Sequence, residues 1–228
     1  MERRQFLRWG LGTSAAVAAT TVVGAAAQAS AATQAGLMCA PTARQTSGPF
    51  YPGEKAFTNS QDLTRLPGAL NRARGQVVYI RGQVRDSQCR PLANANVEIW
   101  QACETGRYNH QNDPNTAALD PDFAYWGETF TDANGEYIFK TIIPGSYPAD
   151  EGWDRPPHIH FRVSKLGYRE LVTQSYFKGH PLNDKDLILL NIPEAQRGDV
   201  VVDFQPSAKG LEPNSLTGSF NITLLSVR

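Results

Sequence analysis

Gln76-Val77-Val78-Tyr79-Ile80-Arg81-Gly82-Gln83-Val84 is the stretch that decides the fold class of this 228-residue chain. It is rich in β-branched and aromatic residues, which favour the extended conformation of a β-strand. A turn over residues 86–91 follows it, and Ala95-Asn96-Val97-Glu98-Ile99-Trp100-Gln101 then alternates between apolar and polar side chains. Such alternation is typical of a strand with one buried face, so the chain is expected to be rich in β-structure from about residue 76.

The same pattern continues toward the C-terminus. Asp132-Ala133-Asn134-Gly135 separates two short strand-like segments, residues 128–131 and 135–139, and its Asn-Gly pair predicts a tight hairpin. Short strands joined by frequent turns, without long helical periodicity, predict an all-β fold, an antiparallel β-sandwich with long loops. Further strands are expected at His158–Ser164, Glu170–Phe177, Val200–Phe204 and Ser219–Val227.

The first residues have the features of an export signal. Arg3-Arg4-Gln5-Phe6-Leu7-Arg8 is a twin-arginine pattern, followed by an apolar, alanine-rich run and by small residues suited to cleavage. We interpret residues 1–31 as a twin-arginine signal peptide rather than a general secretory signal or a membrane anchor. The expected mature protein is periplasmic or secreted, with an irregular N-terminal arm over residues 32–75 and the β-sandwich over residues 76–228.

Composition excludes several classes of partner. The chain has 22 Lys and Arg against 22 Asp and Glu, and this balance does not suggest binding to nucleic acid or to an anionic membrane. No later segment is apolar enough to span a bilayer, so no membrane contact is expected of the mature form. Three cysteines, Cys39, Cys89 and Cys103, permit one disulfide and one free thiol, and the sequence leaves the pairing open.

Arg155-Pro156-Pro157-His158-Ile159-His160-Phe161 is the segment that carries chemistry. On a strand, residues two apart point to the same face, so the two imidazoles are expected to converge. Two imidazoles are half of a four-ligand metal site. One alternative is a zinc-binding or cupin-like sandwich that uses His158, His160 and His180. Another is a metal-free binding module of the transthyretin-like type, which shares the strand pattern.

The order and spacing of several motifs resemble one family, the intradiol ring-cleavage dioxygenases, and within it the protocatechuate 3,4-dioxygenase type with its beta-subunit-like ligand set. The resemblance covers nearly all of the expected mature chain. It implies that Tyr108, Tyr147, His158 and His160 are ligands of Fe(3+). The matching segments are Thr46–Pro52, Trp100–Ala102, Gly106–Tyr108, Asn112-Asp113, Thr131–Gly135, Pro144–Pro148, Arg155–Phe161 and Thr173–Phe177.

The ligand chemistry agrees with that implication. A free tyrosine titrates near pH ~10, so two phenolates require a strongly Lewis-acidic metal in order to ionise at neutral pH. Hard anionic oxygen donors combined with imidazoles suit ferric iron better than zinc. Two phenolates and a hydroxide would also cancel the three positive charges of the metal, and a neutral centre costs less to bury.

The resemblance also implies an activity and further site residues. The expected reaction cleaves the bond between the two hydroxylated carbons of a catechol with O2 and gives a cis,cis-muconate. Tyr147 is expected to act as a departing ligand and base, Arg155 to stabilise negative charge, and Gln174 to complete the catalytic group. The residues expected to contact the substrate are Trp100, Pro49, Tyr51 and Trp153.

Two departures from the family pattern bear on the substrate. The tryptophan expected just after Tyr147-Pro148 is Ala149 here, and Trp153 is a candidate to refill its space. Arg107, Arg162 and Lys165 are the candidates for binding a substrate carboxylate. Because the chain carries both the ligand set and the arm, a homo-oligomer is expected.

Overall fold

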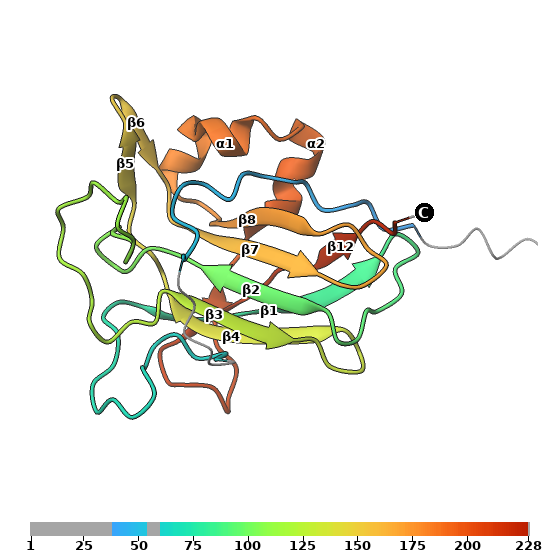
Figure 1. Ribbon diagram of the computed structural model, residues 1–228, viewed down its shortest axis with the longest axis horizontal. Helices are drawn as coiled ribbons and strands as arrows, with labels where there is room; N and C mark the ends of the chain where they lie inside the picture. Colours follow the sequence, from blue (N-terminus) through green and yellow to red (C-terminus); the bar gives the residue numbers. More distant parts are fainter. Residues whose placement is uncertain (1–37, 54–59, 228) are drawn as a thin grey trace, which may run out of the picture. The chain divides into compact units, whose positions relative to one another are not determined.

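The computed structural model describes residues 38–53 and 60–227, so the predicted signal peptide lies outside the described residues. Two five-stranded sheets form the framework of this part of the chain (Figure 1). None of its helices is both long and apolar enough to cross a bilayer.

The first sheet has the order β10-β11-β1-β12, with β4 paired to the other side of β1. The second has the order β3-β2-β7-β8-β9. Bounds in the first sheet are β1 Val77–Asp86, β4 Glu136–Ile142, β10 Gln205–Pro206, β11 Leu216–Ser219 and β12 Ile222–Leu224. Those in the second are β2 Asn96–Trp100, β3 Trp126–Phe130, β7 His158–Ser164, β8 Leu171–Phe177 and β9 Val201–Val202.

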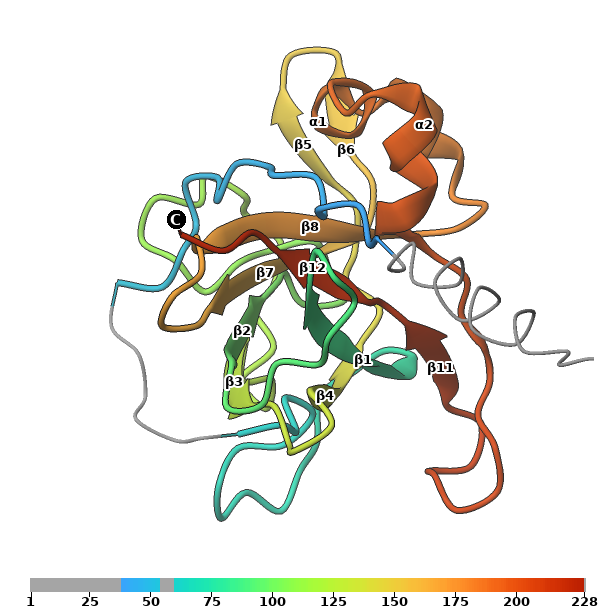
Figure 2. The same cartoon turned by 90° about the vertical axis from the view of Figure 1, so that its right-hand side faces the viewer.

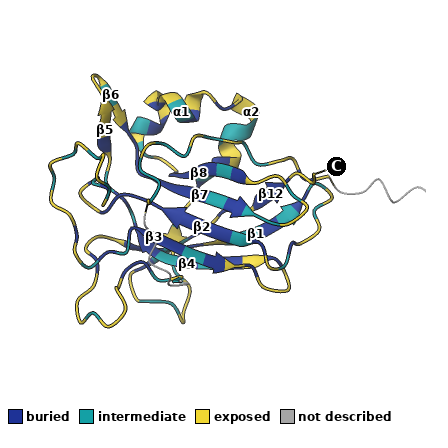
Figure 3. Ribbon diagram, in the orientation of Figure 1, coloured by how far each residue is buried: buried dark blue, intermediate teal, exposed yellow. Residues whose placement is uncertain are grey.

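The inward faces of the two sheets share one hydrophobic core, which confirms the predicted β-sandwich. Ile80 and Phe139 of the first sheet and Ile99 and Phe161 of the second are fully buried in the same cluster. The rings of Phe161 and Phe220 meet across it, with centroids 4.9 Å apart. Figure 3 shows the strands mostly buried and the loops mostly exposed.

The sheets differ from the antiparallel expectation in two respects. Three of the pairings are parallel: β1 with β11, β1 with β12, and β8 with β9. The hairpin predicted around Asn134-Gly135 is wrong, because β3 pairs with β2 and β4 pairs with β1. The turn itself forms, with Asp132 Oδ1 accepting from the Asn134 and Glu136 backbone N–H groups. It therefore carries the chain from one sheet to the other.

A small hairpin and several short helices lie beside the second sheet. The hairpin consists of β5 (Tyr147–Asp150) and β6 (Trp153–Arg155), and Tyr147 is the cross-strand partner of Arg155. Figures 1 and 2 both place this hairpin next to helix α1. The helical segments are η1 Pro181–Lys185, α1 Leu187–Leu190, α2 Glu194–Arg197 and η2 Gly198–Val200.

The N-terminal arm runs alongside β8. In its described part the arm forms no helix or strand of its own, in line with the irregular arm that the sequence predicted. The Gln45 N–H donates to the Val172 carbonyl, and Thr173 Oγ1 donates to the Ala43 carbonyl. A disulfide joins Cys39 to Cys89, between β1 and β2, and Cys103 is a buried free thiol. The pairing that the sequence left open therefore ties the arm to the sandwich.

Candidate metal centre

Strand β7 places two histidines on the outer face of the second sheet. Ile159, Phe161 and Val163 point into the core, so His158 and His160 point to the opposite face, as the two-residue period requires. The arm and the loops cover that face, and both imidazoles are buried. Their Nε2 atoms lie 3.2 Å apart, so the predicted convergence is observed.

The hydrogen bonds of His158 define its tautomer. Its Nδ1 lies 2.7 Å from the Pro156 carbonyl oxygen, which can only accept, so Nδ1 carries the hydrogen and Nε2 presents a lone pair. A carbonyl that orients the second ring nitrogen in this way is typical of a metal-binding histidine. Burial, and next the Arg155 cation, lower the pKa of both imidazoles well below the ordinary histidine value. Both rings are therefore neutral at pH 7, the form that binds metals.

Two loops bring the tyrosines to the same place. Gly106, with φ +82°, and Gly145 pack so closely that a Cβ on either would collide with backbone of the other loop. The Gly145 N–H also donates to the Cys103 carbonyl at 2.9 Å. This backbone contact sets the Tyr108 and Tyr147 rings edge to face, with centroids 5.6 Å apart.

Both phenols lie against the histidines. Tyr108 Oη is 3.3 Å from His158 Nε2, and the Tyr147 and His158 ring centroids are 5.7 Å apart. Burial raises the pKa of Tyr108 well above its ordinary value, and the neighbouring Tyr147 raises it further. Burial also raises the pKa of Tyr147, and the Arg155 cation opposes that shift. Without a cation bound among them, these phenols stay protonated at neutral pH.

The donor set fits a ferric ion. Tyr108 Oη and His160 Nε2 both lie within hydrogen-bond distance of His158 Nε2, and His160 Nδ1 is buried without a partner among the described residues. Neutral imidazoles and phenols that need a Lewis acid to ionise are the donors expected around Fe(3+).

The zinc or cupin-like alternative is not supported. Residues 38–53 and 60–227 contain no group of three or more His, Cys, Asp or Glu side chains placed to hold a metal. His180, its third histidine, instead accepts the Leu182 N–H at the start of η1.

Arg155 lies at the edge of the four candidate ligands and is buried. Its Nη1 is 3.3 Å from His158 Nε2, and its Nη2 donates to Gln174 Oε1 at 2.8 Å. Arg155 and Gln174, two of the residues expected from the family resemblance, therefore lie together beside the histidines. Gln174 in turn donates to the Thr46 carbonyl of the arm, which links the arm to the site.

Two residues of this network were not predicted. Asp186 accepts from Arg155 Nε at 2.8 Å, and Tyr176 Oη lies 3.2 Å from Arg155 Nη2. Tyr176 alternates with Gln174 on β8, so strand periodicity was a signal for it. Asp186 precedes the apolar run Leu187–Leu190, a pattern that indicates a helix cap and says nothing of Arg155.

The residues expected to contact substrate occupy different positions. Trp100 is 1% exposed, and its ring stacks on the His160 imidazole with centroids 4.7 Å apart. It therefore packs against a candidate ligand. Tyr51 packs edge-on against Trp100, and Pro49 is exposed on the arm. Trp153 is half-buried, and its ring centroid lies 5.9 Å from the Arg155 guanidinium carbon. Phe50 of the arm contacts Tyr108, with centroids 4.8 Å apart.

The three cations considered for a substrate carboxylate have other partners. Arg162 binds Glu170 and Tyr51. Arg107 donates to the Ala117 carbonyl, and Lys165 to the Asn94 carbonyl. The structure therefore does not direct these three side chains toward the candidate ligands.

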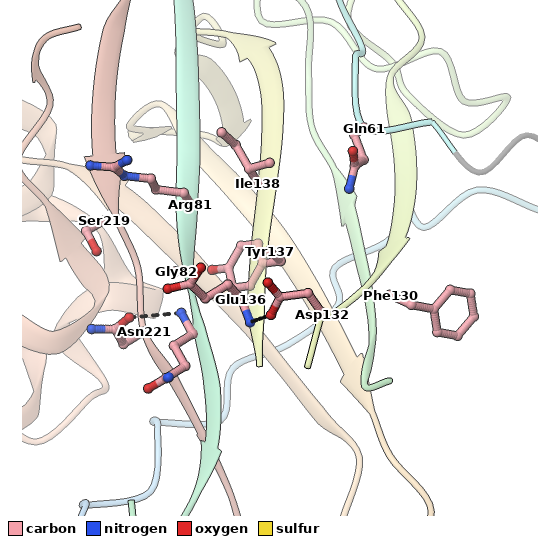
Figure 4. Close-up of a pocket in the computed structure, with 11 residues that line it drawn as sticks. Gln61, Arg81, Gly82, Phe130, Asp132, Glu136, Tyr137, Ile138, Ser219 and Asn221 are labelled. Carbon is pink, nitrogen blue, oxygen red and sulfur yellow. Dashed lines mark hydrogen bonds between the residues drawn. The ribbon is translucent and has the colours of Figure 1, made fainter. Parts of the chain in front are cut away.

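A surface hollow of about 480 Å³ opens elsewhere, over β1 and β4 of the first sheet (Figure 4). Arg81, Asp132, Glu136 and Asn221 line it, and none of the candidate ligands does. Two of its polar side chains accept backbone hydrogen bonds within the hollow: Asn221 Oδ1 accepts the Gln83 N–H, and Asp132 Oδ1 accepts the Glu136 N–H. The chemistry is therefore expected at the tyrosine–histidine cluster.

Comparison with known proteins gives consistent matches. A family model described as "Dioxygenase" matches residues 46–225. The protocatechuate 3,4-dioxygenase beta chain of Burkholderia cepacia is 38% identical over 186 residues, covering 79% of this chain and 78% of that protein. Catechol 1,2-dioxygenase of Candida albicans is 31% identical over 174 residues, covering 69% of this chain and 52% of that protein. The chain thus spans about half of the latter relative.

Solved structures of dioxygenases also have folds similar to that of this chain. The dioxygenase domain of a carbohydrate-binding fusion protein from Streptomyces sp. SirexAA-E superposes with a TM-score of 0.61 at 25% identity, covering 82% of this chain and 100% of that one. Catechol 1,2-dioxygenase from Pseudomonas arvilla C-1 gives a TM-score of 0.64 at 26% identity, covering 81% of this chain and 62% of that one.

Proposed function

The chain belongs to the intradiol ring-cleavage dioxygenase family, and on that premise we propose that it is a ferric enzyme acting on a catechol-type aromatic. The proposed reaction adds both atoms of O2 and breaks the bond between the two hydroxylated carbons, which gives a cis,cis-muconate. The observation that carries the proposal is that Tyr108 Oη and His160 Nε2 both lie within hydrogen-bond distance of the buried His158 Nε2.

Tyr108, Tyr147, His158 and His160 would hold the metal. Ferric iron bound there supplies the Lewis acidity that ionises a catechol and the electron affinity that makes its ring reactive toward O2. The two tyrosines differ in their setting. Tyr108 is 3% exposed, whereas Tyr147 is 8% exposed and begins a hairpin whose next three residues are exposed. Tyr147 is therefore the tyrosine better placed to move, and its Oη would take one of the two catechol protons.

Arg155 would stabilise the negative charge that develops on the substrate. Its guanidinium is buried and always protonated, and its Nη1 faces the ligand atoms. Gln174 holds the neighbouring Nη2 and is itself held by the arm through the Thr46 carbonyl. The arm thus orients this side of the site while Phe50 covers Tyr108.

The substrate class rests on the relatives, whose names give protocatechuate and catechol. We propose a protocatechuate-like or related catechol. We also propose that the chain works as a homo-oligomer, because its own arm reaches its own site. Export by the twin-arginine pathway to the periplasm or beyond is proposed from Arg3-Arg4, and the Cys39–Cys89 disulfide suits an oxidising compartment.

The test is a visible absorption spectrum of the protein purified without chelators, recorded before and after anaerobic addition of catechol or protocatechuate. We expect a broad tyrosinate-to-iron charge-transfer band that shifts with one of the two compounds, and O2 uptake with muconate formation once air is admitted. A protein that stays colourless after reconstitution with ferric iron would contradict the proposal.

A further inference from the structure

Asp186 is the one buried anion in contact with the Arg155 guanidinium among the described residues. It is 0% exposed, and its Oδ2 accepts from Arg155 Nε at 2.8 Å. Its Oδ1 lies 3.4 Å from Arg155 Nη2, so the carboxylate faces one edge of the guanidinium with both oxygens. Paired, two-point contacts of this kind fix the plane of an arginine as well as its position.

The remaining contacts of the Arg155 guanidinium leave a single nitrogen, Nη1, to face the candidate ligands. Nη2 donates to Gln174 Oε1 at 2.8 Å and lies 3.2 Å from Tyr176 Oη. With Nε and Nη2 occupied, Nη1 is the nitrogen that faces His158 Nε2. Rotation of the guanidinium would have to break the bonds to Asp186 and Gln174 together.

We propose that Asp186 is a positioning residue of the dioxygenase site: it balances the charge of Arg155 and directs Nη1 toward the reacting centre. The proposal rests on the proposed function for its chemical consequence. Its physical basis is independent of the reaction, because a buried cation that loses its only anionic contact is strongly destabilised. The two residues are 31 positions apart in the sequence, so their contact brings the helical segment to the site.

A purely structural role is the rival explanation. Asp186 is also the N-cap of α1, where its Oδ1 accepts the Leu189 N–H at 2.7 Å. Asparagine caps a helix about as well as aspartate. Asp186→Asn therefore preserves the cap acceptor and removes the charge, which separates the two roles.

The experiment is a double-mutant cycle on the iron-loaded enzyme with Asp186→Asn, Arg155→Gln and the double variant. Iron content, kcat, KM for the accepted catechol and the free energy of unfolding in urea are measured for each. Glu194→Gln is the matched control, because Glu194 is an exposed acid in the first turn of α2 and its loss changes net charge equally.

Four results are expected. Asp186→Asn retains iron but lowers kcat about 10–100-fold, the usual effect of removing a partner that orients a site residue. In the Arg155→Gln background the same substitution lowers kcat no further. The double variant is more stable than Asp186→Asn alone, since it no longer buries an unpaired cation. Glu194→Gln behaves as wild type.

Other results would overturn the proposal. An unchanged kcat in Asp186→Asn, or losses that multiply in the double variant, would show that Asp186 does not act through Arg155. If Asp186→Asn fails to fold, the double variant decides: recovery of folding supports the charge pair, whereas failure of both variants would show that the carboxylate acts in the fold independently of Arg155 and would overturn the proposal. A wild type that cleaves no catechol refutes the proposed function, whereas the unfolding cycle still reports on the charge pair.

Discussion

At the scale of single residues, Tyr147 is the candidate ligand whose replacement would separate iron binding from substrate binding. Tyr147→Phe removes only the hydroxyl of a residue whose cross-strand partner in the β5–β6 hairpin is Arg155. The other three donors remain, so we expect iron to be retained. Anaerobic binding of the catechol should slow by about 10²-fold, because a positioned base for one proton is lost. Stopped-flow absorbance measures this rate, and binding kinetics equal to those of wild type would refute the role of Tyr147 as a base.

The sequence predicted which residues lie together where they alternate along one strand. It predicted this less well where the residues come from separate segments of the chain. His158 and His160 could be placed on one face from alternation alone, and the structure confirms it. Tyr108 lies on a loop and Tyr147 at the start of β5, outside the second sheet, so only the family resemblance joined them to the histidines. Asp186 was missed because its contact with Arg155 depends on how the helical segment folds back, which no local pattern encodes.

At the scale of structural elements, the contact between the Gly106 and Gly145 loops is predicted to hold the two tyrosines in place. Gly106→Ala would put a Cβ against the Ser146 carbonyl oxygen and 3.3 Å from Tyr147 Cβ. Because backbone cannot easily yield, we expect a loss of unfolding free energy and weaker iron retention. Gly167→Ala is the matched control: its φ of +86° carries the same backbone strain, roughly 1–2 kcal/mol, but nothing lies within 4 Å of the added carbon. Equal losses in the two variants, measured by urea unfolding and iron content, would show that the loop contact does not matter.

The strand elements show the limit of local signals in another way. Asp132 to Gly135 form the turn that their sequence favours, with the Gly135 N–H donating to the Asp132 carbonyl. The turn does not determine which strands pair, because β3 pairs with β2 and β4 with β1, in separate sheets that face a common core. Turn chemistry is set by four residues, whereas strand partners are set by burial across the whole domain.

At the scale of the whole molecule, Glu212 links segments that are distant in sequence. Its carboxylate binds Lys140 of β4 at 2.9 Å and Arg72 of the arm at 2.6 Å. The hydrogen bond from Lys140 lowers the pKa of Glu212 below its ordinary value, although its burial opposes the shift. A carboxyl whose pKa is lower in the folded state stabilises the fold fully above its unfolded pKa, near 4.5, and this contribution disappears as pH falls through the folded pKa.

Glu212→Gln is therefore predicted to reduce stability at pH 7 but not at pH 2. Because the partners are partly exposed, the expected loss at pH 7 is modest, on the order of 1 kcal/mol. Urea unfolding of wild type and variant at both pH values measures the difference, and acid effects that the two proteins share cancel in it. Added salt should shrink the difference at pH 7, since partly exposed pairs are screened. Glu151→Gln, an exposed acid in the β5–β6 turn, is the control for net charge. A Glu212→Gln deficit that persists unchanged at pH 2 would mean that the carboxylate acts through packing and not through its charge.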